Sequence, residues 1–454
     1  MNNQLYAGFA RVDITPPMGI SVIGYYIPRY AEGVLDNLEV NAVALKHGET
    51  TVLLIAVDNC ELSMSACSEI SKAITDKTGV PKEAIFIHTT HTHTGPGGTL
   101  GSEDPAEIKE MLNRYDAFLR SRCVDVAKFA IDDLKPAKMG YGVGKAPDVA
   151  FIRRFRMKDG SIMTNPGVNN PDIVAPIGEV DERVNVLRFE RDNAETIVLA
   201  NFGNHPDTVG GSKISGDWPT LTRSTLEKAI DNTKCIFFNG AQGDVNHVKV
   251  NPTAGDFNDM FNDFDGCSRG YGHAKHIANV VAGAIMQVYA KVNYVDVDEI
   301  KYLQKEYMMP SNKPTPEELP LAHKYNDLHN AGKDDEIPYK AMMLTTVVAE
   351  AARMVRLENA PDAFPLVFSA IKIGNVALFG IPGEPFTGVG RGIKLAKDYD
   401  LVLPCCLING AEGYYPMKDA YDEGGYEARS SSFKSGIAER IIDAGLEMLA
   451  ELKK

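Results

Sequence analysis

Long uninterrupted apolar runs are missing from this sequence. No stretch approaches the about 20 apolar residues that a helix needs to span a bilayer. The chain begins with MNNQLYAGFARVDITPP, which lacks the basic start and the apolar core of a secretory signal peptide. We therefore expect a protein without a transmembrane segment that resides in the cytoplasm, or that is secreted if a signal peptide has been trimmed.

An excess of positive charge is also missing. The 454 residues include 61 acidic and 47 basic side chains, so the formal net charge is -14, and no long basic run offsets it. A polyanion such as a nucleic acid, or an anionic membrane surface, would be repelled by such a chain. We expect no nucleic-acid partner, and the composition leaves the oligomeric state open.

Regularly paired cysteines are missing as well. The chain has 7 cysteines, an odd number at irregular spacings, with Cys405 and Cys406 adjacent. This pattern fits neither a disulfide framework nor a metal knuckle built from two CxxC pairs. We expect reduced and mostly buried thiols.

What is present is an alternation of short apolar runs with segments of helical period. Runs rich in Val, Ile, Leu and Phe predict buried strands at residues 51–58, 84–88, 196–201, 235–238 and 376–379. Helical periodicity predicts helices at residues 64–77, 104–134, 219–231, 272–291, 386–398 and 433–452. Strands that alternate with helices over most of the chain indicate an α/β fold with helices flanking the sheet.

Two segments modify this simple alternation. Residues 364–373 and 376–381, joined at Gly374 and Asn375, predict a hairpin, so we expect a mixed β-sheet. Residues 308–337 are polar and rich in proline, which predicts a surface excursion. We favour a plain connecting insert over a lid for this segment.

The unusual polar motifs all follow apolar strands directly. They are THTHTGPGG at residues 90–98, NFGNHPDT at 201–208, NGAQGDVNH at 239–247, IPGEPFT at 381–387 and NGAEGYYP at 409–416. The carboxyl ends of strands line the binding crevice of α/β sheets. We therefore expect one shared active site at the carboxyl ends of these strands.

Histidines in the first motif suggest a metal. In an extended segment side chains alternate, so His91 and His93 are expected on one face, whereas His88 has the opposite parity and is expected to be structural. His91, His205 and Glu384 would form a His2Glu set, which zinc accepts while leaving a position for water. These residues are too far apart in the chain for spacing alone to assemble them, so a metal and a purely structural role both stay open here.

The order of the motifs resembles the catalytic domain of the neutral, non-lysosomal ceramidases. The resemblance begins at ARVDITPP and continues through THTHTGPGG, NHPDT, ISGDWP, QGDV, PGEPFT and NGAEGYYP to GGYEARSSS, over nearly the whole chain. It implies a single ceramidase-like catalytic domain over residues 1–454, with a polar and helical insert around residues 303–362. The family's C-terminal β-sandwich domain has no counterpart in the sequence.

The resemblance also implies a metal site and its surroundings. Zinc would be held by four residues, which are His91, His205, Glu384 and Tyr414. Four further residues are implied or suggested as catalytic: His93 as the imidazole beside the metal, Arg153 and Tyr426 as substrate contacts, and Asp244. Arg154 adjoins Arg153 and competes with it for the substrate-binding role. Asp244 either orients a ligand histidine or serves as a turn residue.

The implied activity is zinc-dependent hydrolysis of an amide bond in a small or lipid-like N-acyl substrate. Asn246 and His247 depart from the family, which has a serine followed by other residues there, so the substrate is open. Two alternatives remain. A zinc esterase or lactonase would use the same water with a different pocket, and a non-catalytic relative would keep the metal without turnover.

Overall fold

The computed structural model describes residues 4–100, 104–253, 255–256 and 258–454. Its largest sheet has nine strands in the order β14-β12-β11-β6-β1-β3-β4-β5, with β18 beside β6. The strands are β1 (Leu5–Asp13), β3 (Glu39–His47), β4 (Thr50–Val57), β5 (Ile85–Thr89), β6 (Lys135–Lys145), β11 (Arg183–Arg191), β12 (Thr196–Phe202), β14 (Thr233–Asn239) and β18 (Asn293–Val295). Strand β4 pairs with β5 and β12 with β14 in parallel, while the neighbours between them are antiparallel. The predicted mixed sheet is therefore confirmed.

A second sheet of four strands has the order β19-β20-β21-β23. Its strands are β19 (Ile300–Pro310), β20 (Ala363–Ile373), β21 (Val376–Gly380) and β23 (Leu401–Cys405). Strands β20 and β21 form the predicted hairpin, with Ile373 opposite Val376. Gly374 in the turn has φ 55°, a left-handed conformation that glycine adopts without strain.

Short strands build the loops around these sheets. They are β2 (Gly33–Val34) with β13 (Lys213–Ile214), β7 (Phe151–Ile152) with β15 (Val245–Asn246), β8 (Arg154–Met157) with β9 (Ile162–Thr164) and β10 (Ile173–Pro176), β16 (Phe261–Asn262) with β17 (Ser268–Arg269), and β22 (Glu384–Pro385) with β24 (Tyr414–Tyr415). The parallel pair of β22 and β24 joins two of the motifs that the sequence singled out.

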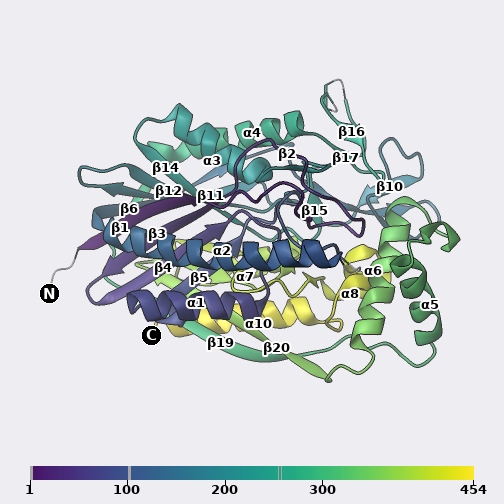
Figure 1. Cartoon of the computed structure of the whole chain (residues 1–454). Helices are drawn as coiled ribbons and strands as arrows, with labels where there is room; N and C mark the ends of the chain where they lie inside the picture. Colours follow the sequence, from purple (N-terminus) through teal and green to yellow (C-terminus); the bar gives the residue numbers. More distant parts are fainter. Residues whose placement is uncertain (1–3, 101–103, 254, 257) are drawn as a thin grey trace.

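Helices cover the sheets on several sides (Figure 1). They are α1 (Met64–Thr78), α2 (Ala106–Asp132), α3 (Asp217–Ala229), α4 (Tyr271–Tyr289), α5 (Leu319–Asn330), α6 (Ala341–Leu357), α7 (Thr387–Ile393), α8 (Lys418–Glu423), α9 (Tyr426–Ser430) and α10 (Ile437–Leu452). Helix α2 packs on β1 and β3, α4 packs on β6 and β11, and α10 packs on β19, β20 and β21. The α/β prediction is confirmed.

Helix α7 is shorter than the predicted helix at residues 386–398. It ends at Ile393, and its sequence TGVGRGI contains three glycines. Glycine is about 1 kcal/mol less favourable than alanine in a helix. The weak propensity explains why the apolar period of this segment does not continue as helix.

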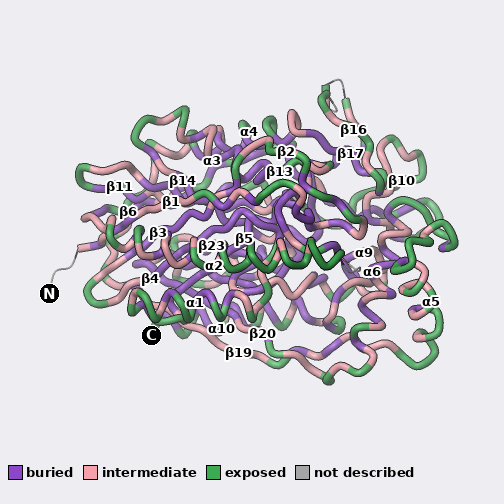
Figure 2. The backbone as a smooth tube through the Cα atoms, viewed as in Figure 1, coloured by how far each residue is buried: buried purple, intermediate pink, exposed green. Residues whose placement is uncertain are grey.

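The core is made of strand interiors, which Figure 2 shows as buried beneath half-exposed helices. The largest hydrophobic cluster contains Val43 and Ile55 of the nine-stranded sheet together with Ile371 and Leu378 of the four-stranded sheet, so the two sheets share a core. All seven cysteines are free and buried, as predicted. Among the described residues no helix is long and apolar enough to cross a membrane.

The polar segment between β19 and β20 forms a helical hairpin. Helices α5 and α6 pack on each other, at the end of the molecule opposite the two chain termini (Figure 1). The hairpin is attached to the body through a small apolar cluster in which Val347 and Val348 pack with Tyr26. It also contacts α9 through α6.

A buried ion pair anchors the loop that follows β4. The Arg223 guanidinium on α3 donates to both oxygens of Asp58, from Nη1 to Oδ1 at 3.0 Å and from Nη2 to Oδ2 at 2.6 Å. The two side chains are 1% and 0% exposed. Thr220 and Thr90 also donate to Asp58. Helix α3, strand β4 and the motif after β5 are thus tied to one carboxylate.

We expect Arg223→Met to destabilise the protein by about 3–5 kcal/mol, because the change leaves the buried Asp58 carboxylate without its cation. Urea denaturation followed by circular dichroism measures the effect. Lys72→Met is the control, since Lys72 pairs with Asp76 on the exposed face of α1. Such surface pairs contribute at most about 1 kcal/mol. Equal midpoints for both variants would contradict the anchoring role.

Candidate metal centre

The ends of the predicted strands are bonded to one another. His88 at the end of β5 accepts a hydrogen bond from the backbone N of Asn239 at 3.1 Å, and its Nδ1 donates to the carbonyl of Cys406 at 3.0 Å. The side-chain amide of Asn239 donates to the carbonyl of Thr90 at 2.8 Å. His88 is therefore structural, as expected, and it connects the ends of β5, β14 and β23.

Three imidazoles and one carboxylate converge beside this junction. Oε2 of Glu384 lies 3.2 Å from Nε2 of His91 and 3.4 Å from Nδ1 of His205. Nε2 of His93 lies 3.3 Å from Nε2 of His91 and 3.2 Å from Nε2 of His205. His91, His205 and Glu384 form a buried group whose ligand atoms all lie within 4.8 Å of one another. Residues that are far apart in the chain, such as His91 and Glu384, thus meet at one point.

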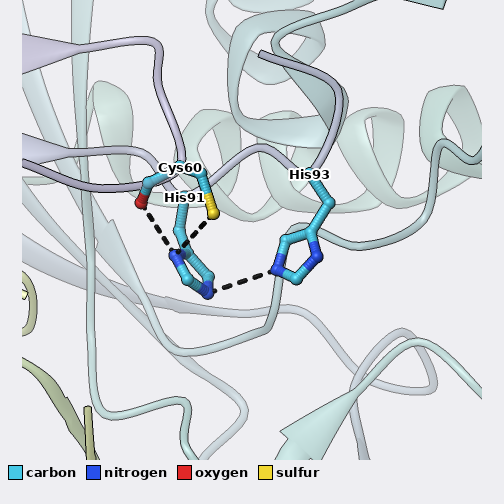
Figure 3. Close-up of side chains that lie close together, drawn as sticks. All are labelled: Cys60, His91 and His93. Atoms are coloured by element: carbon cyan, nitrogen blue, oxygen red, sulfur yellow. Dashed lines mark hydrogen bonds between the residues drawn. The ribbon is translucent and has the colours of Figure 1, made fainter. Parts of the chain in front are cut away.

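His91 reaches this point by a route that the alternation of strand side chains did not predict. Strand β5 ends at Thr89, and His91 has φ 70°, in the left-handed region. Its Nδ1 donates to the carbonyl of Cys60 at 2.8 Å (Figure 3). A carbonyl oxygen only accepts, so Nδ1 holds a proton, and Nε2 is the ring nitrogen that faces Glu384.

In the described structure, two buried polar atoms at the site lack hydrogen-bond partners, and a bound cation would supply the missing contact. Oε2 of Glu384 and Nδ1 of His205 are buried and have no hydrogen-bond partner among the described residues. A buried polar atom without a partner costs free energy, and a buried carboxylate oxygen costs most. Two nitrogens and a carboxylate oxygen are donors that zinc accepts. The residues present therefore fit a divalent cation.

The electrostatics keep two of the imidazoles neutral. Burial lowers the pKa of His93 to about 3. Burial, followed by the Arg153 guanidinium, lowers the pKa of His205 well below its usual value. The pKa of His91 is raised instead, because the Glu384 carboxylate outweighs the effect of burial. Neutral imidazoles at His93 and His205 offer lone pairs at neutral pH, and metal binding requires neutral histidines.

Tyr414 stands next to the carboxylate. The pairing of β22 with β24 places Tyr414 directly opposite Glu384. Burial and the Glu384 carboxylate raise the pKa of Tyr414 well above its usual value. The ring of Tyr426 packs edge-on against that of Tyr414, with centroids 5.6 Å apart. Both predicted tyrosines therefore reach the site.

The structure distinguishes the two adjacent arginines. The guanidinium of Arg153 lies over the Tyr414 ring, 5.3 Å from its centroid, and its Nε donates to Glu427 at 2.7 Å. Arg154 instead donates to Glu423 at 3.1 Å. Arg153, and not Arg154, is therefore the arginine that lies beside the candidate metal ligands.

Asp244 lies close by but bonds to another partner. Its carboxylate accepts hydrogen bonds from the backbone N of Thr387 at 2.7 Å and from the Thr387 hydroxyl at 2.9 Å. Gly243 N also donates to the carbonyl of Pro385 at 2.9 Å. Of the two roles considered for Asp244, the contacts describe a brace for the turn that presents Glu384, and they include no hydrogen bond from Asp244 to a site histidine within the described part of the chain.

Asn246 is also occupied elsewhere. Its amide donates to Oδ1 of Asn165 at 2.8 Å and its oxygen accepts from Val248 N at 3.0 Å. It is not among the described residues that line the cavity at the site. The departure from the family pattern at this position therefore falls outside the cavity wall.

Asp207 is a site residue that the sequence analysis missed. Its Oδ1 lies 3.7 Å from Nδ1 of His93. Arg269 donates to both oxygens of Asp207 at 2.9 and 2.7 Å, and the Tyr25 hydroxyl donates to it at 2.6 Å. Burial alone would raise the pKa of Asp207, but Arg269 lowers it below its usual range. The signal was available in NHPDT, where the aspartate follows His205 by two residues.

A cavity of about 390 Å³ opens onto the cluster. Besides His91, His93, Glu384, Tyr414 and Tyr426, its wall includes residues from the loops after β4 and before β24, from the ends of α6 and α9, and from β20. Arg356 is the contribution of α6. The insert thus forms part of the cavity wall.

The fold is similar to that of two solved ceramidase structures. The neutral ceramidase from Pseudomonas aeruginosa superposes with a TM-score of 0.72 and 16% sequence identity, over 99% of this chain and 74% of that chain. A structure of ceramidase complexed with C2 gives a TM-score of 0.72 and 16% identity, over 99% of this chain and 75% of that one. No protein-family model and no curated protein matches the sequence. At this identity the likeness establishes the fold, which is the fold that the resemblance implied.

We expect the purified protein to contain about one divalent ion per chain, because three buried donors face one point. His91→Ala and Glu384→Ala should each lose most of that metal in inductively coupled plasma mass spectrometry. His323→Ala is the matched control, since His323 is half-exposed and pairs with Glu358 outside the cluster. Full metal content in both cluster variants would refute the assignment.

Proposed function

We propose that this protein is a zinc-dependent hydrolase that cleaves an amide bond of an N-acyl substrate. The observation that supports the proposal is the convergence of His91, His205 and Glu384 on one point beside a cavity whose wall includes His91 and Glu384. The likeness of the fold to that of neutral ceramidase agrees with it. The zinc ligands we propose are these three residues and the phenol of Tyr414.

A bound zinc ion would polarise a carbonyl group and lower the pKa of water from about 15.7 to about 7. The chain prepares its ligands for this role. Nδ1 of His91 is held by the Cys60 carbonyl, so Nε2 is fixed as the donor atom. Asp244 and Gly243 brace the turn that presents Glu384. Such supporting bonds orient metal ligands and limit their motion.

We assign proton transfer to His93. Its Nε2 lies among the proposed metal donors, where it would take a proton from the attacking water. The Asp207 carboxylate lies near Nδ1 on the other side of the ring, where it stabilises the imidazolium that forms. Nε2 then returns the proton to the leaving nitrogen. Arg269 and Tyr25 keep Asp207 in position by their hydrogen bonds.

Tyr426 and Arg153 have complementary roles in this proposal. The Tyr426 side chain lines the cavity, and we assign to its hydroxyl a hydrogen bond to the oxyanion. Arg153 is bound to Glu427 and to the Tyr414 hydroxyl. It contributes positive charge beside the site and fixes the phenol that we propose as a zinc ligand.

Turnover of paired amide and ester substrates tests the proposal. We expect N-acyl amides to be hydrolysed, with loss of activity in a chelator such as 1,10-phenanthroline and recovery on addition of zinc. Turnover of esters or lactones alone would favour the esterase alternative. Stoichiometric metal without turnover of any substrate would favour a non-catalytic binding protein. Chelator-resistant amide hydrolysis would contradict the metal mechanism.

We expect Tyr426→Phe to lower kcat by about 10²- to 10³-fold, since it removes one donor to the oxyanion. Steady-state kinetics with the best amide substrate measures the effect. Tyr294→Phe is the control, because Tyr294 is exposed and its hydroxyl donates to Glu190. A kcat within twofold of the unmodified enzyme for Tyr426→Phe would contradict the oxyanion role.

A further inference from the structure

The wall of the cavity is mostly polar. Among the described residues that line it, only three large side chains are apolar, namely Leu100, Phe364 and Phe433. The volume of about 390 Å³ lies at the lower end of the about 300–1,000 Å³ typical of ligand pockets. A long alkyl chain gains about 0.8 kcal/mol for each methylene only when the methylene leaves water for an apolar surface. In a cavity of this volume the apolar part of the wall has room for a short acyl chain but not for two long ones.

Two carboxylates and one guanidinium line the cavity without ion-pair partners among the described residues. Glu61 follows β4, and Glu412 precedes β24. Arg356 at the end of α6 donates to the hydroxyl of Ser432 at 2.9 Å. None of the ion pairs between described residues involves Glu61, Glu412 or Arg356. Glu61 and Arg356 are exposed and Glu412 is half-buried, so their side chains retain hydrogen-bonding capacity for a ligand that enters the cavity.

The charges of the wall favour a neutral ligand. Three carboxylates and one guanidinium line the cavity, and a divalent cation at the cluster would balance their formal charges. An acyl compound with a net charge would disturb this balance. Hydroxyl groups suit the wall better, because each hydroxyl donates to a carboxylate and accepts from a guanidinium or serine.

The insert holds this part of the wall in place. The Arg353 guanidinium on α6 donates to the backbone carbonyls of Arg429 at 2.9 Å and Asn312 at 2.6 Å. Nε of Arg429 on α9 donates in turn to Glu350 of α6 at 2.8 Å. Arg356 on α6 and Ser430 on α9 are thus fixed relative to Tyr426. A rigid wall of this kind discriminates between ligands by geometry as well as by charge.

We propose, on the basis of the hydrolase function above, that the substrate is a short-chain N-acyl amine whose amine part carries several hydroxyl groups, as in an N-acetylated amino sugar. Water supplies its oxygen to the acyl carbon and both of its protons to the leaving nitrogen, so the C–N bond breaks and a carboxylate and a protonated amine are released. Arg356 and Glu412 are the residues that recognise the hydroxyl groups. The substrate is therefore a small polar amide and not a lipid with two long chains.

Two matched substrate series test this inference. The first varies the acyl chain on glucosamine from two to sixteen carbons. The second keeps the acetyl group and varies the amine between glucosamine, butylamine and glycine. We expect kcat/KM to be at least tenfold higher for acetyl than for sixteen-carbon glucosamine, and at least tenfold higher for the hydroxylated amine than for the alkyl or anionic amine. Preference for the sixteen-carbon chain or for butylamine would overturn the inference while leaving the amide hydrolase in place.

Variants of the wall give a second readout. Glu412→Gln and Arg356→Gln should each reduce the preference for the hydroxylated over the alkyl amine by at least fivefold, mainly through KM. Glu358→Gln is the control, because Glu358 pairs with His323 outside the cavity. An unchanged preference in both wall variants would overturn the role given to these residues.

Calorimetry with N-acetylglucosamine separates the inference from the hydrolase function. Binding to the purified protein that is weakened at least fivefold by Glu412→Gln supports the wall assignment even if no amide is hydrolysed, in which case only the hydrolase function fails. Absence of both binding and turnover with every hydroxylated amide would overturn the inference, and the hydrolase function fails as well only if the alkyl and anionic amides are not hydrolysed either.

Discussion

The burial of the Glu384 carboxylate is the constraint on which the site depends. Its side chain is 8% exposed, and it faces His91 and His205 rather than a lysine or an arginine. A buried carboxylate is tolerated when positive charge compensates it, and of the two imidazoles that of His205 is neutral and supplies a lone pair rather than charge. The arrangement therefore makes physical sense around a cation, and the braces at His91 and at the turn of Glu384 keep the donor atoms together when electrostatic repulsion between lone pairs would separate them.

Buried arginine–carboxylate pairs hold the loops that surround this centre. Arg223 ties the loop after β4 through Asp58, Arg269 ties the loop after β12 through Asp207, and Arg153 ties α9 through Glu427. Desolvation of the two charges offsets much of their attraction, so an intact pair contributes little net stability, even though removal of one partner is costly. Their bidentate or hydrogen-bonded geometry fixes distance and direction instead. We infer that these pairs serve the precision of the site more than the stability of the fold.

The sequence predicted the α/β class, the hairpin of β20 and β21, and the strand ends at which polar motifs gather, because these features follow from local period and turn chemistry. It did not predict the left-handed conformation of His91 or the early end of α7. The meeting of His91 with His205 and Glu384 came from the family resemblance, since no local pattern encodes contacts between distant segments. Arg356 escaped notice for the same reason, because a single arginine late in a surface helix gives no sign that the helix closes a cavity.

Chemistry and specificity are built from different parts of this fold. The candidate metal donors come from residues directly after core strands, whose positions are fixed by the sheets, and the fold as a whole is similar to that of solved ceramidases at 16% identity. The cavity wall comes from connecting loops and from the insert that carries α6, which tolerate change without cost to the core. A fold of this kind can keep one hydrolytic centre while its substrate changes. The polar wall around Glu412 and Arg356 is therefore better evidence for the substrate than the likeness of the fold.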